Sequence, residues 1–113
     1  MKGTCLVTGA AGGIGKAIVA RLARDGFSVI AADLDAARAS SVIEGLEGTH
    51  RAIALDVSDE AAVQACFAEA EAAGAPVDHV VAAAGILLFA ANGDRPALTD
   101  ITLDEWELTQ RVN

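Results

Sequence analysis

Short apolar runs recur along the chain and predict four strands. The first two runs are continuous and show no polar alternation, as expected for strands that are buried on both faces of a sheet. The second run ends at Asp33. The four predicted strands span residues 4–7, 27–32, 52–57 and 77–84.

Between these runs, apolar residues recur at the spacing of amphipathic helices. The first predicted helix closes near the basic residues Arg21 and Arg24, with Gly26 after them. Its expected apolar face consists of Ile14, Ala17, Ile18 and Leu22. Asp35 is suited to cap a second helix that continues to Leu46.

Polar signals mark the starts of two further helices. Ser58, Asp59 and Glu60 predict a third helix, because acidic residues favour the positive N-terminal end of a helix. The residues that this helix is expected to bury are Val63, Cys66, Phe67 and Ala70. Thr102 and Glu105 have the spacing of a capping box, so a fourth helix is expected to begin there.

The predicted strands and helices alternate along the sequence at a spacing that indicates right-handed strand–helix–strand crossovers. Such crossovers build a parallel sheet. We expect the strand order 3-2-1-4, which is half of a doubly wound α/β fold. At 113 residues, the chain is one domain at most. The carboxyl ends of the first and fourth strands then border a crevice, which is where ligands bind in such sheets.

The stretch TGAAGGIGK, residues 8–16, follows the first strand and opens the first helix at this crevice. A glycine-rich turn there lets the backbone and the helix N-terminus approach a nucleotide phosphate. The spacing excludes a P-loop, because Lys16 is followed by Ala17 rather than by Ser or Thr. The common G-x-G-x-x-G fingerprint is also excluded, since it would need glycine in place of Ile18. A tight turn without a ligand is the alternative.

The remaining pattern, T-G-x-x-x-G-x-G through Thr8, Gly9, Gly13 and Gly15, resembles the short-chain dehydrogenase/reductase family. With Gly12, the loop also satisfies the T-G-x-x-G-x-x-G of the extended branch, so the loop alone leaves the branch open. The resemblance implies a Rossmann-type doubly wound parallel sheet with the cofactor on this loop. The implied cofactor-binding residues of the loop are Gly9, Gly12, Gly13, Ile14 and Gly15.

Later segments resemble the standard branch of the family. The run VAAAG at residues 81–85 occupies the place of its N-N-A-G motif. Asp56-Val57 resembles the pair that contacts adenine. The implied cofactor contacts beyond the loop are Asp56, Val57, Ala83, Ala84 and Gly85. Trp106 and Asn113 resemble the tryptophan and the catalytic asparagine of the family's fourth helix. The alternative for Asn113 is a polar residue at a helix end.

Two features depart from the family pattern. Ala82 and Ala83 stand where the family has two asparagines. The chain has no tyrosine, and its only lysines are Lys2 and Lys16, whereas the family's catalytic Tyr-x-x-x-Lys lies beyond the fourth helix. Residues 1–113 are therefore interpreted as the N-terminal part of a single dinucleotide-binding domain, inactive alone, with the catalytic half absent. The alternative is a complete, non-catalytic dinucleotide-binding or interaction module.

Cofactor choice is indicated at the end of the second strand. Asp33 lies where dinucleotide folds place the acid that accepts hydrogen bonds from ribose hydroxyls, and a carboxylate there repels a 2′-phosphate. Leu34 follows and is also expected to contact the cofactor, at the place where family members that use NADP carry a basic residue. Arg38 is expected on a solvated helix face. The alternative for Asp33 is a helix cap, although Asp35 is available for that role. We therefore expect NAD as the cofactor.

The resemblance implies hydride transfer between NAD and a small alcohol or carbonyl substrate, in a homo-oligomer built through the fourth helix. The net charge of −8 argues against nucleic acid as a partner. No basic segment precedes the first apolar run, and the longest apolar stretch, residues 80–91, is too short to cross a membrane. Cys5 and Cys66 lack metal-binding spacing and fit a reducing, cytoplasmic location.

The remaining polar residues are expected to have no catalytic role. His50 and His79 flank the third and fourth strands at their amino ends, opposite the crevice, and are expected on the surface. Asp94, Arg95 and Asp100 lie in the long connection before the fourth helix, where a solvated rim is expected.

Overall fold

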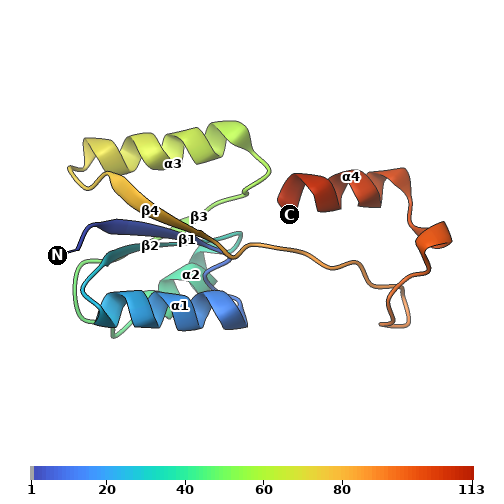
Figure 1. Ribbon diagram of the computed structural model, residues 1–113, viewed down its shortest axis with the longest axis horizontal. Helices are drawn as coiled ribbons and strands as arrows, with labels where there is room; N and C mark the ends of the chain where they lie inside the picture. The colour runs from blue at the N-terminus through green and yellow to red at the C-terminus, as the bar shows by residue number, and fades with distance from the viewer. Residues whose placement is uncertain (1) are drawn as a thin grey trace.

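The computed structural model describes residues 2–113 and contains a four-stranded parallel sheet in the order β3-β2-β1-β4 (Figure 1). The strands β1 to β4 are Thr4–Thr8, Ser28–Asp33, Arg51–Ala54 and Val77–Ala82. The helices α1 to α4 are Gly13–Arg24, Ala36–Ile43, Glu60–Ala72 and Leu103–Val112, and a short 3-10 helix spans Leu98–Asp100. The predicted doubly wound topology and strand order are confirmed.

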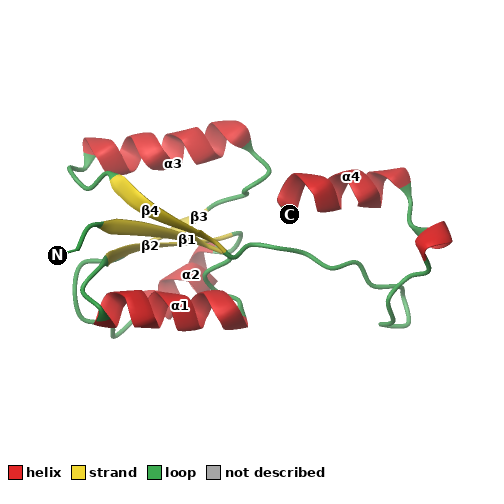
Figure 2. Cartoon of the chain, viewed as in Figure 1, coloured by secondary structure: helices red, strands yellow, loops and turns green. Residues whose placement is uncertain are grey.

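Helices cover both faces of the sheet, with α1 and α2 on one face and α3 on the other (Figure 2). Val7 of β1 packs with Val19 of α1 on the first face, while Leu6 packs with Cys66 of α3 on the second. All five residues of β1 are buried. Burial on both faces explains why this strand lacks polar alternation in the sequence.

Three elements end earlier than the sequence pattern predicts. The second helix stops at Ile43 rather than Leu46, because Glu44 is extended (ψ 128°) and Gly45 adopts a left-handed φ of +77°. β3 ends at Ala54, although the Leu55 N–H still donates to the Asp33 carbonyl (2.8 Å). β4 ends at Ala82 rather than at residue 84.

The apolar faces of two helices were predicted correctly only in part. Ile18 and Leu22 of α1 pack against the core, as do Val63, Cys66 and Ala70 of α3. Ile14 is 76% exposed and Ala17 is exposed, whereas Gly15 and Val19 are the buried residues of α1. Because Gly15 has no side chain, α1 packs closely on the preceding loop and presents a face rotated from the predicted one. On α3, Phe67 remains 38% exposed.

His50 was expected on the surface, but it is half-buried and ties a loop to the sheet. Its Nδ1 accepts the Val29 N–H (3.1 Å), and its Nε2 lies 2.8 Å from the Glu47 carbonyl oxygen. The ring therefore connects the start of β2 to the loop that precedes β3. His79 is exposed, as expected, with its ring edge-on to Phe27.

The fourth helix stands apart from the sheet, at the end of a long connection (Figure 1). Its predicted capping box is present: the Thr102 hydroxyl accepts the Glu105 N–H, and the Glu105 carboxylate accepts the Thr102 N–H. Several of its apolar side chains face solvent, among them Leu103 and Trp106, which is 52% exposed. The capping box therefore fixes where the helix begins, and these exposed side chains do not pack on the sheet.

Candidate functional site

A cleft of about 140 Å³ opens at the carboxyl edge of the sheet, where the loops after β1, β2, β3 and β4 converge. The residues that line it are Gly9, Asp33, Leu34, Leu55, Asp56, Val57, Ala84, Gly85, Ile86 and Val112. The topology explains this meeting point, since parallel strands bring all their carboxyl ends to one edge.

Gly9 brings the loop after β1 against the end of β4. Its φ is +63°, a left-handed conformation that favours glycine. A Cβ on Gly9 would lie only 2.7 Å from the carbonyl oxygen of Ala83 and from the backbone of Ala84. A side chain at this position would therefore separate the first and fourth strands at the floor of the cleft.

The other loop glycines fall into two groups. A Cβ on Gly15 would collide with the carbonyl of Gly9, so Gly15 is needed for packing of α1 on the loop. A Cβ on Gly13 would meet nothing within 4 Å, and one on Gly12 would meet only the Gly9 carbonyl oxygen, at 3.4 Å. Gly12 and Gly13 therefore leave open space at the N-terminus of α1.

Asp33 lies on the cleft wall and makes two hydrogen bonds to the backbone. Its Oδ2 accepts the Ala11 N–H (3.1 Å), and its Oδ1 accepts the Asp35 N–H (3.3 Å). The cap of α2 is Asp35, whose Oδ1 accepts the Ala37 N–H at 2.9 Å. Asp33 is therefore not the helix cap, and its carboxylate connects the glycine loop to the end of β2.

Asp56 also lines the cleft, from the turn after β3. Its Oδ1 accepts the Ser58 hydroxyl (2.6 Å) and the Ser58 N–H (2.9 Å). These hydrogen bonds, the hydroxyl first, hold the pKa of the Asp56 carboxyl below its ordinary value. The carboxylate is therefore ionised at neutral pH and can accept further hydrogen bonds.

Thr8 fixes the segment after β4. Its buried hydroxyl accepts the Ala84 N–H at 3.3 Å, just beyond the last residue of the strand. This bond connects the end of β1 to the segment that follows β4. Thr8 was identified from the sequence only as the first residue of the glycine-loop motif, and its contact with Ala84 was not predicted.

Asn113 joins the end of α4 to the same segment. Its Oδ1 accepts the Ile86 N–H (2.8 Å) and its Nδ2 donates to the Ile86 carbonyl (3.0 Å), so the whole carboxamide is engaged by one residue. A Cβ on Gly85 would lie 3.4 Å from Asn113 Oδ1. The asparagine thus holds α4 at the rim of the cleft.

The structure brings most of the predicted cofactor residues to the cleft, but not all of them. Those outside its lining are Gly12, Gly13, Ile14, Gly15 and Ala83. Ile14 lies instead on an apolar strip of α1 that also includes the exposed Ala17 and the half-buried Ile18. The sequence did not predict Leu55, Ile86 or Val112 as lining residues, because each is an apolar residue in an irregular or helix-end position with no motif of its own.

The profile of the short chain dehydrogenase family matches residues 3–113. The chain belongs to this family. It is 38% identical, over 99% of its length, to a short-chain dehydrogenase/reductase of Hericium erinaceus, of which it covers 45%. It is also 38% identical to the D-threitol dehydrogenase of Mycolicibacterium smegmatis, covering 40% of that protein. The 2,3-dihydro-2,3-dihydroxybenzoate dehydrogenase of Bacillus subtilis is 37% identical, with 40% covered.

This short-chain dehydrogenase chain thus spans less than half the length of the curated relatives it matches. Among residues 2–113, no cluster of three or more His, Cys, Asp or Glu side chains could bind a metal ion. In the same described part of the chain, no helix has the length and apolar character needed to span a membrane.

Proposed function

We propose that the protein is an NAD-dependent oxidoreductase that transfers a hydride between NAD and a small alcohol or carbonyl substrate. Family membership supports the reaction class, and one observation supports the cofactor. The Asp33 carboxylate lies on the wall of a cleft that Gly9 of the glycine loop also lines, and it accepts the Ala11 N–H of that loop. Residues 3–113 supply the cofactor-binding part of this activity.

The cleft and the neighbouring start of α1 together fit a dinucleotide. In the described chain, α1 begins at Gly13 without a side-chain cap and without an acidic residue in its first turn, so its N-terminal N–H groups are suited to an anion. Gly12 and Gly13 leave the space that a pyrophosphate needs. Asp33 would accept hydrogen bonds from the adenosine ribose, and Asp56 with Val57 would border the adenine.

The preference for NAD rests on charge and on what surrounds Asp33. The 2′-phosphate of NADP would meet the carboxylate directly, and the next residue, Leu34, is 72% exposed and offers no positive charge. At about 4 Å and an effective dielectric near 20, the repulsion between two unit charges is about 4 kcal/mol before screening by salt. That is large compared with one ordinary hydrogen bond.

The bound nicotinamide would supply the hydride chemistry. Asn113 is proposed to contribute to the reaction by positioning α4 rather than through chemistry of its side chain. Both polar atoms of its side chain are engaged by the Ile86 backbone, and its N–H donates to the Thr109 carbonyl (2.9 Å). Its main-chain carbonyl is therefore the group left to take part in proton transfer. We therefore assign Asn113 a positioning role, in which it fixes the end of α4 beside the cleft. Its proton-relay role is a family expectation that this geometry permits.

Three further properties belong to the same proposal. The 113-residue chain alone is expected to be inactive, because it has no tyrosine to act as the proton donor. A homo-oligomer is supported by exposed apolar side chains on α4, namely Leu103, Trp106 and Leu108. A cytoplasmic location is supported by two free, buried cysteines, whose thiol pKa values are raised by burial.

The proposal is tested by titrating the protein with NAD and NADP and by assaying hydride transfer with simple secondary alcohols. We expect tight NAD binding, weaker NADP binding, and turnover only in a protein that includes the tyrosine and lysine of the family. NAD binding without turnover in such a protein would favour the non-catalytic module. Failure to bind either dinucleotide would contradict the proposal.

A further inference from the structure

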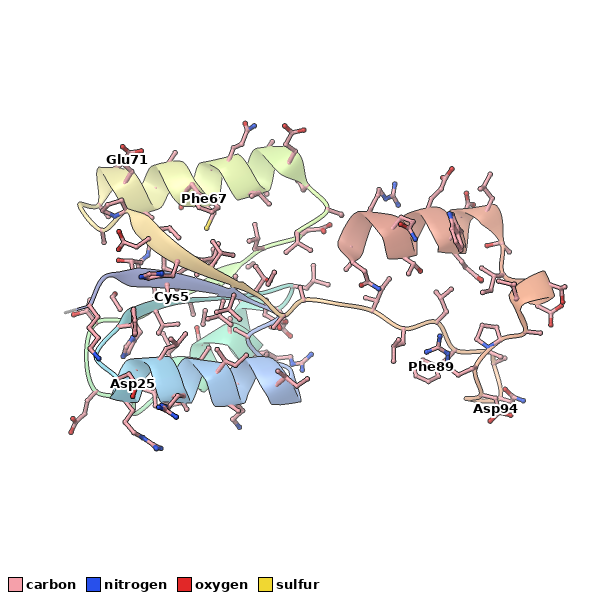
Figure 3. The ribbon with its side chains drawn as sticks, viewed as in Figure 1. Cys5, Asp25, Phe67, Glu71, Phe89 and Asp94 are labelled. Atoms are coloured by element: carbon pink, nitrogen blue, oxygen red, sulfur yellow. The ribbon has the colours of Figure 1, made fainter. Side chains whose placement is uncertain are left out.

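The connection between β4 and α4 forms a tight turn at residues 90–94, in the part of the molecule far from the sheet, where Figure 3 shows Phe89 and Asp94. The Ala90 N–H donates to the Asp94 carbonyl (2.7 Å), and the Gly93 N–H donates to the Ala90 carbonyl (2.9 Å). Gly93 has a φ of +87°, and a Cβ there would meet nothing within 4 Å. Asn92 and Gly93 therefore lie in an exposed and uncrowded turn.

The side chain of Asn92 is folded back over this turn. Its Oδ1 accepts the Asp94 N–H (3.0 Å), and its Nδ2 donates to Asp94 Oδ2 (3.1 Å). The first hydrogen bond withdraws electron density from the Asn92 carboxamide carbon, Cγ. The same N–H is in place to stabilise negative charge that develops on Oδ1 when Cγ is attacked.

We propose that Asn92 is a site of spontaneous modification, at which the asparagine converts through a cyclic imide to isoaspartate. The Gly93 backbone nitrogen loses its proton to a solvent base and attacks Asn92 Cγ, forming a five-membered ring. The Cγ–Nδ2 bond breaks, and Nδ2 takes up a proton and leaves as ammonia. Water then opens the ring at either carbonyl, giving aspartate or isoaspartate. Water is the only co-reactant, and no group is oxidised or reduced.

Two features of the turn set the rate. Gly93 has no side chain to obstruct attack by its own nitrogen, and the Asp94 N–H favours attack at Cγ. The hydrogen bond from the Gly93 N–H to the Ala90 carbonyl must open first. Because the whole turn is exposed, this opening is a local event that does not require unfolding of the sheet.

The product would change the turn in two ways. An isoaspartyl linkage inserts one extra carbon into the backbone between positions 92 and 93. The hydrogen bonds that join Ala90 to Asp94 and to Gly93 would then no longer be aligned. A new carboxylate would also stand beside the Asp94 carboxylate, where an amide donor stood before. The connection that carries α4 would therefore loosen with the age of the protein.

The experiment incubates the protein at mildly alkaline pH and physiological temperature, and detects isoaspartate with a protein isoaspartate methyltransferase and with peptide mass spectrometry. The matched control is Asn92→Gln, which keeps a carboxamide but must form a less favourable six-membered ring. We expect isoaspartate at position 92 and faster formation at higher pH. In the variant, whose ring would open to glutamate or isoglutamate, we expect at least about ten-fold slower loss of ammonia at this position, or about 1.4 kcal/mol in barrier.

Three results would overturn the proposal. Formation of aspartate alone would indicate direct hydrolysis instead of ring closure. Modification in urea but not in the folded protein would mean that the Ala90–Gly93 hydrogen bond protects the site. Equal isoaspartate in Asn92→Gln would place the signal elsewhere. Hydrogen exchange of the Ala90 and Gly93 amides supplies a second readout, since both should lose protection in the modified protein.

Discussion

The Ala11 N–H donates a 3.1 Å hydrogen bond to Asp33 Oδ2, so the residue that ends β2 also holds the loop that follows β1. The second carboxylate oxygen of Asp33 accepts the Asp35 N–H. Removing the Asp33 side chain would therefore disturb the loop as well as the charge of the cleft. A test of cofactor choice needs a variant that changes only the charge.

Asp33→Asn comes nearest to that variant, because its amide oxygen can still accept the Ala11 N–H and only the longer hydrogen bond from the Asp35 N–H (3.3 Å) is lost. We expect the unmodified protein to prefer NAD over NADP by about a hundred-fold or more, given charge-assisted hydrogen bonds of roughly 1.5–3 kcal/mol to ribose and repulsion of a phosphate. The preference should fall by about ten-fold or more in Asp33→Asn. The measurement is the ratio of Kd values, or of kcat/KM values in an active protein, for the two cofactors.

The control is Asp35→Ala. Asp35 caps α2 but is not among the residues that line the cleft. We expect this variant to lower the free energy of unfolding by about 1 kcal/mol and to leave the cofactor ratio unchanged. A preference for NADP in the unmodified protein, or the same ratio in Asp33→Asn, would show that Asp33 does not select the cofactor.

The glycine loop allows packing and ligand binding to be separated. Gly15→Ala should lower the free energy of unfolding by about 1–3 kcal/mol, because its Cβ collides with the Gly9 carbonyl. Gly13→Ala should leave that free energy unchanged or raise it by up to about 1 kcal/mol, since the Cβ meets nothing and alanine favours the helix. Urea denaturation of both variants measures the difference.

NAD affinity should be sensitive to Gly13→Ala, the variant whose stability is not expected to fall. If the pyrophosphate binds at the start of α1, the methyl group of Gly13→Ala occupies ligand space, and NAD affinity should fall while stability is kept. Unchanged NAD affinity in Gly13→Ala would place the pyrophosphate elsewhere in the cleft. Equal stabilities of Gly13→Ala and Gly15→Ala would contradict the packing role of Gly15.

Asn113→Ala should release the end of α4. The substitution removes both hydrogen bonds to Ile86. A buried hydrogen bond contributes about 0.5–1.5 kcal/mol to stability, and solvent exposure makes the contribution of these two smaller. We expect the Ile86 amide to exchange faster with solvent, while amides of β1 keep their protection. Gln110→Ala, on the exposed face of the same helix, is the control and should leave the Ile86 amide unaffected. Unchanged exchange in Asn113→Ala would mean that α4 is held by other contacts.

The sequence predicted the parts of this fold that are determined locally or by strand order. Continuous apolar runs identified β1 and β2, and the caps at Asp35 and Thr102 were confirmed because each needs only its own first turn. The sheet order also followed from the alternation of strands and helices. The predicted ends of strands and helices were less accurate, because hydrogen bonds to side chains decide where the chain turns. The two hydrogen bonds that Ser58 donates to the Asp56 carboxylate are an example.

Features that depend on distant contacts were not predicted. The apolar stripe of α1 indicated Ile14 as buried, but close packing of Gly15 on Gly9 rotates that residue into solvent. The double hydrogen bond of Asn113 joins residues 27 positions apart, and no motif in the sequence shows it. Cleft residues with a motif were found by pattern, whereas apolar lining residues such as Val112 required the structure.

The titration of Asp56 gives a final prediction. Two hydrogen bonds from Ser58 favour the ionised form, so the pKa of the Asp56 carboxyl lies below its ordinary value of 3.8. Because this pKa is lower in the folded state, the associated stability is present above pH 3.8 and is lost as the pH falls through the folded pKa. The carboxyl is exposed, so the effect on unfolding should be small.

Ser58→Ala removes the hydroxyl, which is the larger cause of the shift, and keeps the Ser58 N–H as a donor. The pKa of Asp56, followed by carboxyl NMR chemical shifts, should therefore rise toward its ordinary value without fully reaching it. Ser41→Ala is the matched control, since the Ser41 hydroxyl donates to the Ala37 carbonyl on α2 instead. An unmoved Asp56 pKa in Ser58→Ala would show that the hydroxyl does not hold the carboxylate at the cleft wall, and the geometry of the turn after β3 would need another cause.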